Sequence, residues 1–245
     1  MKIDVWSDYA CPFCYIGKRR LESAMEQLGM QTAPGTETEV VYRSFQLDPK
    51  APAEGTVGIH KVLARKYGIA EEEALRMNES LAEQARGVGL DFHFERVVHT
   101  NTYDAHRLGQ YAAEQGRGAE MNERLLRAYF TDGLNLGDRG VLVGLAEETG
   151  LEAAPVAAIL ESGAYGDRVE EDIAKAGALG VTGVPFFVFN DKYAISGAQP
   201  GPVFLEVLEM VRAEEKEAPS LRIVGSGETR EAGGDADCSD GSCRV

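Results

Sequence analysis

The chain has 245 residues, of which 44% are hydrophobic and 27% charged, and its formal net charge at pH 7 is −15. A chain of this size and composition can bury a sizeable core, in one elaborated domain or two small ones. The negative charge argues against nucleic-acid binding, which needs a basic surface, and against docking on anionic membranes. No long apolar run predicts a membrane span, and no apolar stretch with a cleavage site precedes the first predicted strand. We therefore expect a cytoplasmic protein.

Two of the four cysteines lie where a predicted strand leads into a predicted helix. Alternating apolar residues predict the strand over residues 3–6, and the helix follows Cys11-Pro12-Phe13-Cys14 and ends at Gly29. A thiolate at Cys11 would face the unpaired N–H groups and the positive dipole end of that helix, which stabilise its charge. Cys14 would lie one turn further in, within reach of a mixed disulfide formed at Cys11. The pattern favours thiol–disulfide exchange, with Cys11 attacking and Cys14 resolving.

The same spacing can also be half of a zinc site. Zinc would need two more ligands, and the other cysteine pair, Cys238 and Cys243, lies in a polar C-terminal region. The position of the first pair between a strand and a helix with Pro12 in its first turn favours redox chemistry. We predict no metal site.

The remaining predicted elements alternate between strands and a long helical block. A second strand over 39–45 closes a βαβ unit. Helices are predicted over 58–67, 70–86, 103–114, 119–129, 138–149, 154–162 and 167–180, with Asp138 as the cap and Gly150 as the end of the helix over 138–149. In the helix over 167–180 we expect Ile173, Ala176 and Leu179 to face the core. Strands over 185–190 and 193–197 read as a β-hairpin, and a helix over 202–212 follows.

Three segments carry a family resemblance. They are Ser7-Asp8 leading into Cys11-Pro12-Phe13-Cys14, the run Asn101 to Leu108, and Gly183-Val184-Pro185-Phe186-Phe187-Val188. With these motifs the chain resembles thioredoxin-fold disulfide oxidoreductases of the DsbA type, and most closely the FrnE-like branch, over roughly residues 1–212. It departs from the family pattern at Phe13, where many relatives carry tryptophan. That change leaves the thiol chemistry intact but alters the surface beside it.

The resemblance implies an α/β fold of the thioredoxin type (βαβ…ββα) with an inserted helical domain. The thioredoxin domain would comprise residues 1–48 and 163–212, the insertion 49–162, and an acidic C-terminal tail 213–245. It also implies that Pro185 is cis and faces the cysteine pair, and that Val184 offers its backbone to an incoming extended peptide. Pro12 and Phe13 would complete the surface that positions substrate. For Asn101 and His106 we favour a structural role, because no step of thiol exchange demands a histidine.

The tail pair invites a second hypothesis. Cys238 and Cys243 enclose a turn-forming glycine, so a local disulfide is sterically easy. A flexible tail could bring this pair back to Cys11 and Cys14 as an auxiliary redox centre. Nearby aspartates would raise the pKa of these thiols and slow their attack on a disulfide. The alternative interpretation is an adventitious or metal-trapping pair.

The sequence thus predicts a thiol–disulfide oxidoreductase that acts on protein disulfides. No bound cofactor is expected, and electrons would come from small thiols such as glutathione or from a partner dithiol protein. One alternative is a glutathione-dependent isomerase or transferase of the 2-hydroxychromene-2-carboxylate isomerase or kappa type, although these relatives typically carry serine where Cys11 stands. Another is a redox-regulated, holdase-like binding protein. Oligomeric state and direction of electron flow are not predicted.

Overall fold

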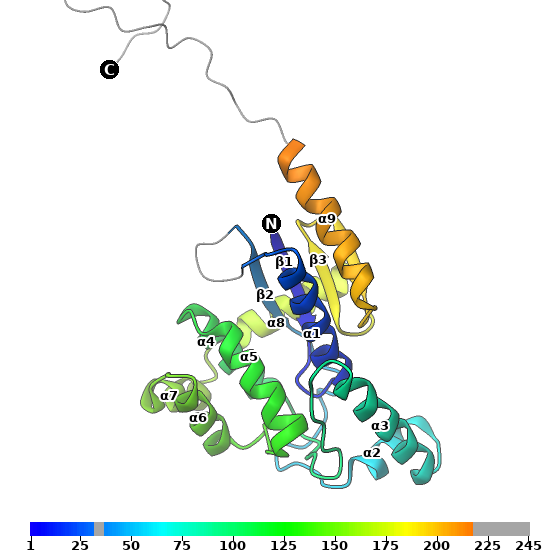
Figure 1. The fold of residues 1–245 in the computed structure, drawn as a ribbon. Helices are drawn as coiled ribbons and strands as arrows, with labels where there is room; N and C mark the ends of the chain where they lie inside the picture. Colours follow the sequence, from blue (N-terminus) through cyan, green and yellow to red (C-terminus); the bar gives the residue numbers. More distant parts are fainter. Residues whose placement is uncertain (32–36, 218–245) are drawn as a thin grey trace, which may run out of the picture.

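The computed structural model describes residues 1–31 and 37–217, and Figure 1 shows their arrangement. Within these residues one sheet holds β1 (Lys2–Ser7), β2 (Glu39–Ser44), β3 (Phe186–Phe189) and β4 (Tyr193–Ser196), in the order β2-β1-β3-β4. The strands β1 and β2 run parallel, while β3 is antiparallel to β1 and to β4. The parallel pair with its intervening helix, followed by an antiparallel hairpin, is the predicted thioredoxin topology.

Alternation along β1 decides what covers each face of the sheet. Ile3 and Val5 share a core with α1 (Pro12–Gln27) and α9 (Gly201–Glu217), which lie side by side in Figure 1. Trp6 points to the opposite face, toward α8 (Gly166–Ala178), and its indole N–H donates to the backbone oxygen of Asp172 at 2.9 Å. The helix α9 also ends five residues later than the predicted 212, at Glu217.

One prediction for α8 is wrong. Leu179 is 50% exposed and lies just beyond the helix end at Ala178. Ala176 is buried as predicted, and Ile173 is partly buried. The other buried residues of α8 are Val169 and Asp172, at three-to-four-residue spacing back from Ala176, whereas Leu179 falls beyond the last helical turn.

The helices between β2 and α8 form a second core. They are α2 (Ile59–Tyr67), α3 (Glu71–Arg86), α4 (Tyr103–Glu114), α5 (Gly118–Arg127), α6 (Arg139–Glu148) and α7 (Ala153–Ser162). A π-helical turn over Ala128–Asp132 replaces the predicted end of the helix over 119–129. Asp138 caps α6 as expected, accepting hydrogen bonds from two backbone N–H groups of its first turn. The core of the block is aromatic and aliphatic, with Phe92, Phe130 and Leu108 among its buried members.

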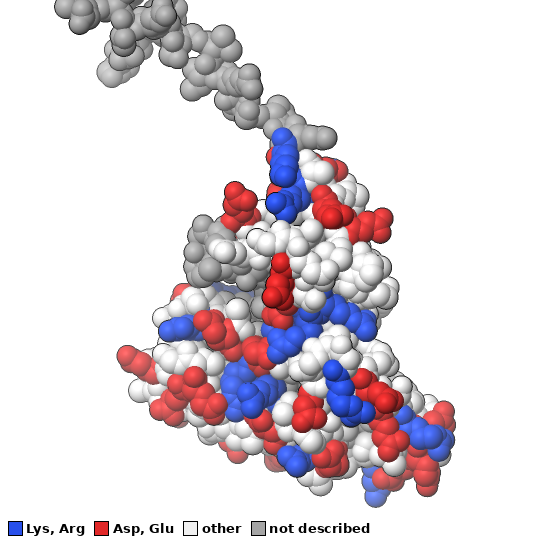
Figure 2. Space-filling view, in the orientation of Figure 1, with Lys and Arg blue, Asp and Glu red and all other residues white. Residues whose placement is uncertain are grey.

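An ion-pair cluster joins this helical block to the helix that carries the cysteines. The ammonium of Lys18 on α1 lies 2.5 Å from Glu123 on α5 and 2.6 Å from Glu22. Arg19 contacts the same two carboxylates, and the Tyr15 hydroxyl donates to Glu123 at 2.5 Å. Acidic and basic side chains are interspersed on this face of the molecule (Figure 2). The described residues contain no helix that is both long and apolar enough to cross a membrane.

Candidate active site

Cys11 lies at the N-terminus of α1, as the sequence predicts. It occupies the N-cap position in an extended conformation, with Pro12 as the first helical residue. The thiol is free and only 4% exposed, and its Sγ lies 3.4 Å from the backbone oxygen of Val184. The most exposed side chain between the cysteines is Phe13, at 43%. The ring of Phe13 therefore forms part of the exposed surface beside the thiols.

Cys14 is free and lies directly behind Cys11, inside the first turn of α1. Its N–H donates to the carbonyl oxygen of Cys11 at 3.1 Å, and its side chain is 3% exposed. Burial raises the pKa of the Cys14 thiol well above its ordinary value, and the hydrogen bond and charge of Cys11 raise it further. Hydrogen bonds with the Ser7 side chain and the Asp8 backbone act in the opposite direction. Cys14 is therefore held as a neutral thiol while Cys11 is reduced.

The loop before β3 forms the other side of the site. The Val184–Pro185 peptide bond is cis, as the resemblance implies, and places the Val184 carbonyl against Cys11. Gly17 on α1 allows this close packing. A Cβ at that position would lie 3.1 Å from both the Pro185 ring and the Phe187 ring. The sequence motifs at 11–17 and 183–188 are thus adjacent in space.

A buried carboxylate that sequence analysis did not single out holds the loop before Cys11. Asp8 is 1% exposed and accepts hydrogen bonds from the backbone N–H of Leu47 at 2.7 Å and of Ala10 at 3.2 Å. The hydroxyl of Thr102 donates to it at 2.9 Å. Burial by itself raises the pKa of Asp8, but the nearby His106 ring and the Leu47 and Thr102 hydrogen bonds outweigh burial and lower it below the ordinary value. Asp8 is therefore an ionised link between the cysteine loop, the segment after β2 and α4.

The side chains of Tyr9 and His106 complete this cluster. The two rings stack at 4.7 Å between centroids, and His106 Nε2 lies 3.4 Å from the nearer Asp8 oxygen. Both rings are buried, and among the described residues His106 Nε2 makes no well-aligned hydrogen bond. Burial and the charge of Asp8 raise the pKa of Tyr9. His106 thus supports the cysteine loop through Asp8 and Tyr9, in keeping with the structural role favoured from sequence.

Two polar side chains at the start of α4 have different partners. The Asn101 side-chain oxygen accepts the N–H of Tyr103 at 2.9 Å, while Thr102 turns its hydroxyl away to Asp8. The sequence signal for the contact between Thr102 and Asp8 was that both residues belong to family motifs, one over 101–108 and the other beginning at Ser7-Asp8. Sequence spacing could not show that the two segments meet.

Comparison with known proteins agrees with the fold. The family model described as a DSBA-like thioredoxin domain matches residues 2–209, and the chain belongs to this family. It is 31% identical to the uncharacterized protein YwbO of Bacillus subtilis over 204 residues, covering 82% of this chain and 92% of the relative. It is 37% identical to a probable DsbA oxidoreductase from Streptomyces coelicolor, with a TM-score of 0.81 over 92% of this chain and 94% of the other.

More distant neighbours share the fold. The cytosolic disulfide reductase DsbM from Pseudomonas aeruginosa, solved with GSH, has 17% identity and a TM-score of 0.59, covering 89% of this chain and 98% of its own. A 2-hydroxychromene-2-carboxylate isomerase has 18% identity and a TM-score of 0.61 with the same coverage. One architecture therefore houses both of the enzyme classes weighed from the sequence. The choice between them depends on the residues at the site.

Proposed function

We propose that the protein is a cytoplasmic thiol–disulfide oxidoreductase that acts on disulfides of other proteins. The observation that carries the proposal is the placement of Cys11. Its free sulfur lies at a helix N-terminus, 3.4 Å from the Val184 carbonyl, with a second free thiol one turn behind it. A helix N-terminus favours the thiolate, which is the form that attacks a disulfide. The assignment to the FrnE-like branch is part of this proposal.

The reaction is a pair of exchange steps. The Cys11 thiolate attacks one sulfur of a substrate disulfide, forms a mixed disulfide and releases the other substrate sulfur as a thiolate, which takes up a proton. Cys14, after losing its proton, attacks the Cys11 sulfur. This step forms the Cys11–Cys14 disulfide and releases the second substrate thiol. The substrate gains two electrons and the protein loses two.

The environment of Cys14 sets the order of these steps. Its pKa is raised by burial and, in addition, by the hydrogen bond and charge of Cys11. Formation of the mixed disulfide removes the charge of Cys11, so that contribution disappears and the Cys14 thiolate becomes easier to form. Cys14 is thereby restrained until Cys11 has reacted.

Substrate would be held by backbone contacts beside the thiols. The segment at Val184 and Pro185 borders Cys11, and an extended peptide lying there could form β-type hydrogen bonds with Val184. Pro12 and the exposed ring of Phe13 would form the opposite border. This surface favours polypeptide substrates over small disulfides.

Electrons would return from small thiols or a partner dithiol protein. Glutathione suits this role, since two glutathione molecules reduce the Cys11–Cys14 disulfide by the same two exchange steps. The fold neighbour DsbM, a cytosolic disulfide reductase, was solved with GSH. The second pair, Cys238 and Cys243, lies outside the described residues, and its auxiliary redox role remains part of the proposal.

Trapping experiments test the assignment. Cys14→Ser should accumulate a stable mixed disulfide between Cys11 and a protein substrate that contains a disulfide. Cys11→Ser should trap no substrate, and its rate of turnover should fall to that of uncatalysed exchange. The matched control is Cys238→Ser with Cys243→Ser, which would retain trapping at Cys11 and change only turnover if the tail pair relays electrons. Glutathione binding without disulfide exchange would favour the isomerase class instead. Suppression of aggregation that survives loss of Cys11 and Cys14 would favour the holdase.

A further inference from the structure

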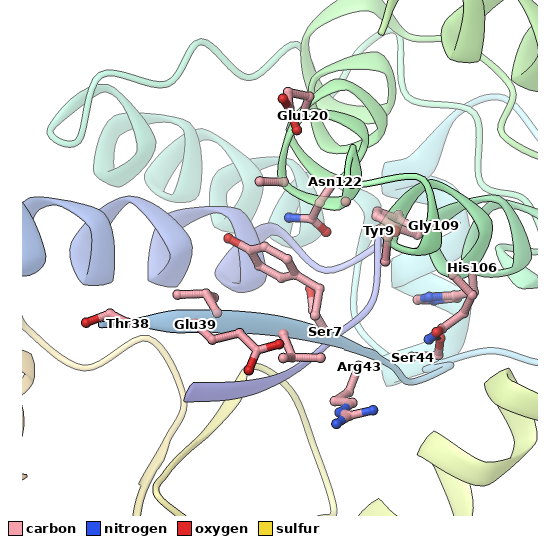
Figure 3. Close-up of a pocket in the computed structure, with 18 residues that line it drawn as sticks. Ser7, Tyr9, Thr38, Glu39, Arg43, Ser44, His106, Gly109, Glu120 and Asn122 are labelled. Carbon is pink, nitrogen blue, oxygen red and sulfur yellow. Dashed lines mark hydrogen bonds between the residues drawn. The ribbon is translucent and has the colours of Figure 1, made fainter. Parts of the chain in front are cut away.

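A cavity lies between the free edge of the sheet and the helical block, and at one end it reaches Ser7, Tyr9 and His106 behind the cysteine loop. It measures about 820 Å³ and is bounded on one side by β2, residues 39–44, and on the other by α4, α5 and the turn between them. Figure 3 shows the strand below and the helices above this space. We call this cavity the β2 groove. Its lining residues include Val40, Tyr42, Gly118, Ala119 and Asn122.

Hydrogen bonding along β2 shows which of its backbone groups face the groove. Glu39 donates its N–H to Met1 at 3.0 Å and Phe45 donates to Ser7 at 3.1 Å, so the odd-numbered residues point toward β1. Backbone groups alternate sides along a strand, and those of even-numbered residues therefore point outward. Ser44 confirms this, since its N–H leaves the sheet to reach Asp172 at 2.9 Å.

Two consecutive outward positions, Val40 and Tyr42, are left open. Neither their N–H nor their C=O groups have a partner among the residues that the structure describes. Residues two apart on a strand edge are the unit by which a neighbouring strand pairs. An open edge of this kind is a template for adding another extended chain.

Asn122 gives an independent indication of a missing partner. Its side chain is 3% exposed, yet its amide nitrogen makes no hydrogen bond to any described residue. In Figure 3 the side chain extends from α5 toward β2, into the groove. A buried unsatisfied donor is costly, and it is normally satisfied by a bound group that carries an acceptor.

The wall opposite β2 allows a polypeptide backbone to enter. Where α4 turns into α5 its lining residues are small, namely Ala113, Gly116, Gly118 and Ala119, with Gln110 and Glu120 on either side. Small side chains permit close approach of a second backbone. Hydrogen-bond groups on one wall, small residues on the other and an unsatisfied amide between them fit an extended peptide.

The charges around the groove select the peptide. The exposed carboxylate of Glu39 lines the groove, as does that of Glu120, which also lies 3.4 Å from the exposed guanidinium of Arg117. The guanidinium of Arg43 is engaged by Asp4 and Asp172. We propose that the β2 groove binds an extended, lysine- or arginine-bearing segment of a client polypeptide, which adds to the sheet beside β2. The proposal rests on the proposed function only in taking the occupant to be a client, because the binding itself requires no thiol.

A cysteine-free peptide separates this binding from the redox reaction. The probe is a blocked, fluorescent nine-residue peptide of alternating valine and lysine, titrated by anisotropy against the full chain carrying Cys11→Ser. Binding should weaken about tenfold or more when alternate backbone nitrogens of the peptide are methylated, because strand pairing is then lost. Replacing its lysines with glutamates should weaken it as well.

Variants of the groove test the same contacts from the protein side. Val40→Pro removes one outward N–H and no bond to β1, and proline is tolerated on an edge strand. Ala119→Trp fills the groove from an exposed helix position and covers the case in which the proline variant fails to fold. Both should weaken peptide binding about tenfold while leaving reduction of a small organic disulfide by the Cys11-containing protein unchanged.

Two results would overturn the proposal. One is equal binding of the methylated and unmethylated peptides, or of the Ala119→Trp and parent proteins. The other is slow hydrogen exchange at Val40 and Tyr42 in the peptide-free full chain, which would mean that the protein's own residues or a second copy already cover the edge. Failure of thiol trapping would leave these binding results in place, so the two proposals fail separately.

Discussion

Two buried aspartates tie the sheet to the helical block, and they are compensated in different ways. Asp8, before the cysteines, accepts only N–H and O–H donors, with the His106 ring nearby. Asp172, on α8, accepts the Ser44 N–H at 2.9 Å and the Gln110 side chain at 2.6 Å, and also faces the guanidinium of Arg43 at 3.2 Å. Arg43 is partly exposed and has a second partner in Asp4. Asp172 therefore has a replaceable partner, whereas the partners of Asp8 are held by the backbone at Ala10 and Leu47 and by the start of α4.

Asp8 and Asp172 also differ in whether they influence thiol exchange in addition to folding stability. The backbone N–H of Asp8 hydrogen-bonds to Cys14, so any shift of its loop moves the resolving thiol. Asp172 lies at the C-terminal end of β2, beside the same end of β1 as Asp8, but its hydrogen bonds go to Ser44 and Gln110 and not to the cysteine loop. A change at Asp8 should alter both folding and thiol exchange, and a change at Asp172 should alter folding alone.

The largest effect is expected in the free energy of unfolding, which Asp8→Asn should lower more than Asp172→Asn does. Both oxygens of Asp8 face backbone N–H groups, so an asparagine NH₂ must oppose one of them in either orientation. We expect a loss of roughly 2–3 kcal/mol in the free energy of unfolding, from an unsatisfied buried donor. Asp172→Asn can keep its oxygen toward Ser44 and turn its NH₂ toward the partly exposed Arg43, at a loss of about 1 kcal/mol. Urea unfolding of both variants measures these values.

The same two variants should differ in the lifetime of the trapped intermediate. Asp8→Asn should lower the ratio of the rate at which Cys14 resolves the Cys11 mixed disulfide to the rate at which that disulfide forms. Asp172→Asn should leave this ratio of rates unchanged. Rapid-quench mass spectrometry measures both steps. Equal ratios in the two variants would contradict a positioning role for Asp8.

Lowering the pH should reduce the difference in unfolding free energy between wild type and Asp8→Asn. The folded protein lowers the pKa of Asp8, so its ionisation contributes stability that is complete above the ordinary aspartate value of about 3.9 and is lost as the pH falls through the lower folded value. Stability measured by urea unfolding should therefore fall more steeply below about pH 4 in wild type than in the variant. Parallel curves from pH 6 to pH 3 would show that Asp8 is not the group responsible.

The smallest effect is expected for Thr102→Val. It removes one neutral donor to Asp8 and should cost about 1 kcal/mol of unfolding free energy, with a modest rise in the midpoint of the acid transition. Thr102→Ser keeps the hydroxyl and serves as the matched control. If serine is as damaging as valine, packing of the methyl group rather than the hydrogen bond explains the loss.

Local patterns allowed much of the chain to be predicted. Strand alternation at Ile3 and Val5, the cap at Asp138 and the glycine-bounded helices all follow from interactions within a few residues, which sequence spacing records directly. The error at Leu179 has the same origin, because periodicity identifies an apolar face without showing where the helix ends. The cysteine motif was recognisable for the same local reason.

What the sequence by itself determined is the reactive pair and its helix, since a thiol three residues from its partner at a helix start is a local arrangement. Only the tertiary structure decided which distant groups surround it. Asp8 meets Leu47, Thr102 and His106 from three separate segments, and the open edge of β2 meets Asn122 across a groove. Spacing along the chain carries no information about such contacts, because folding brings these groups together only when the helical block packs against the sheet.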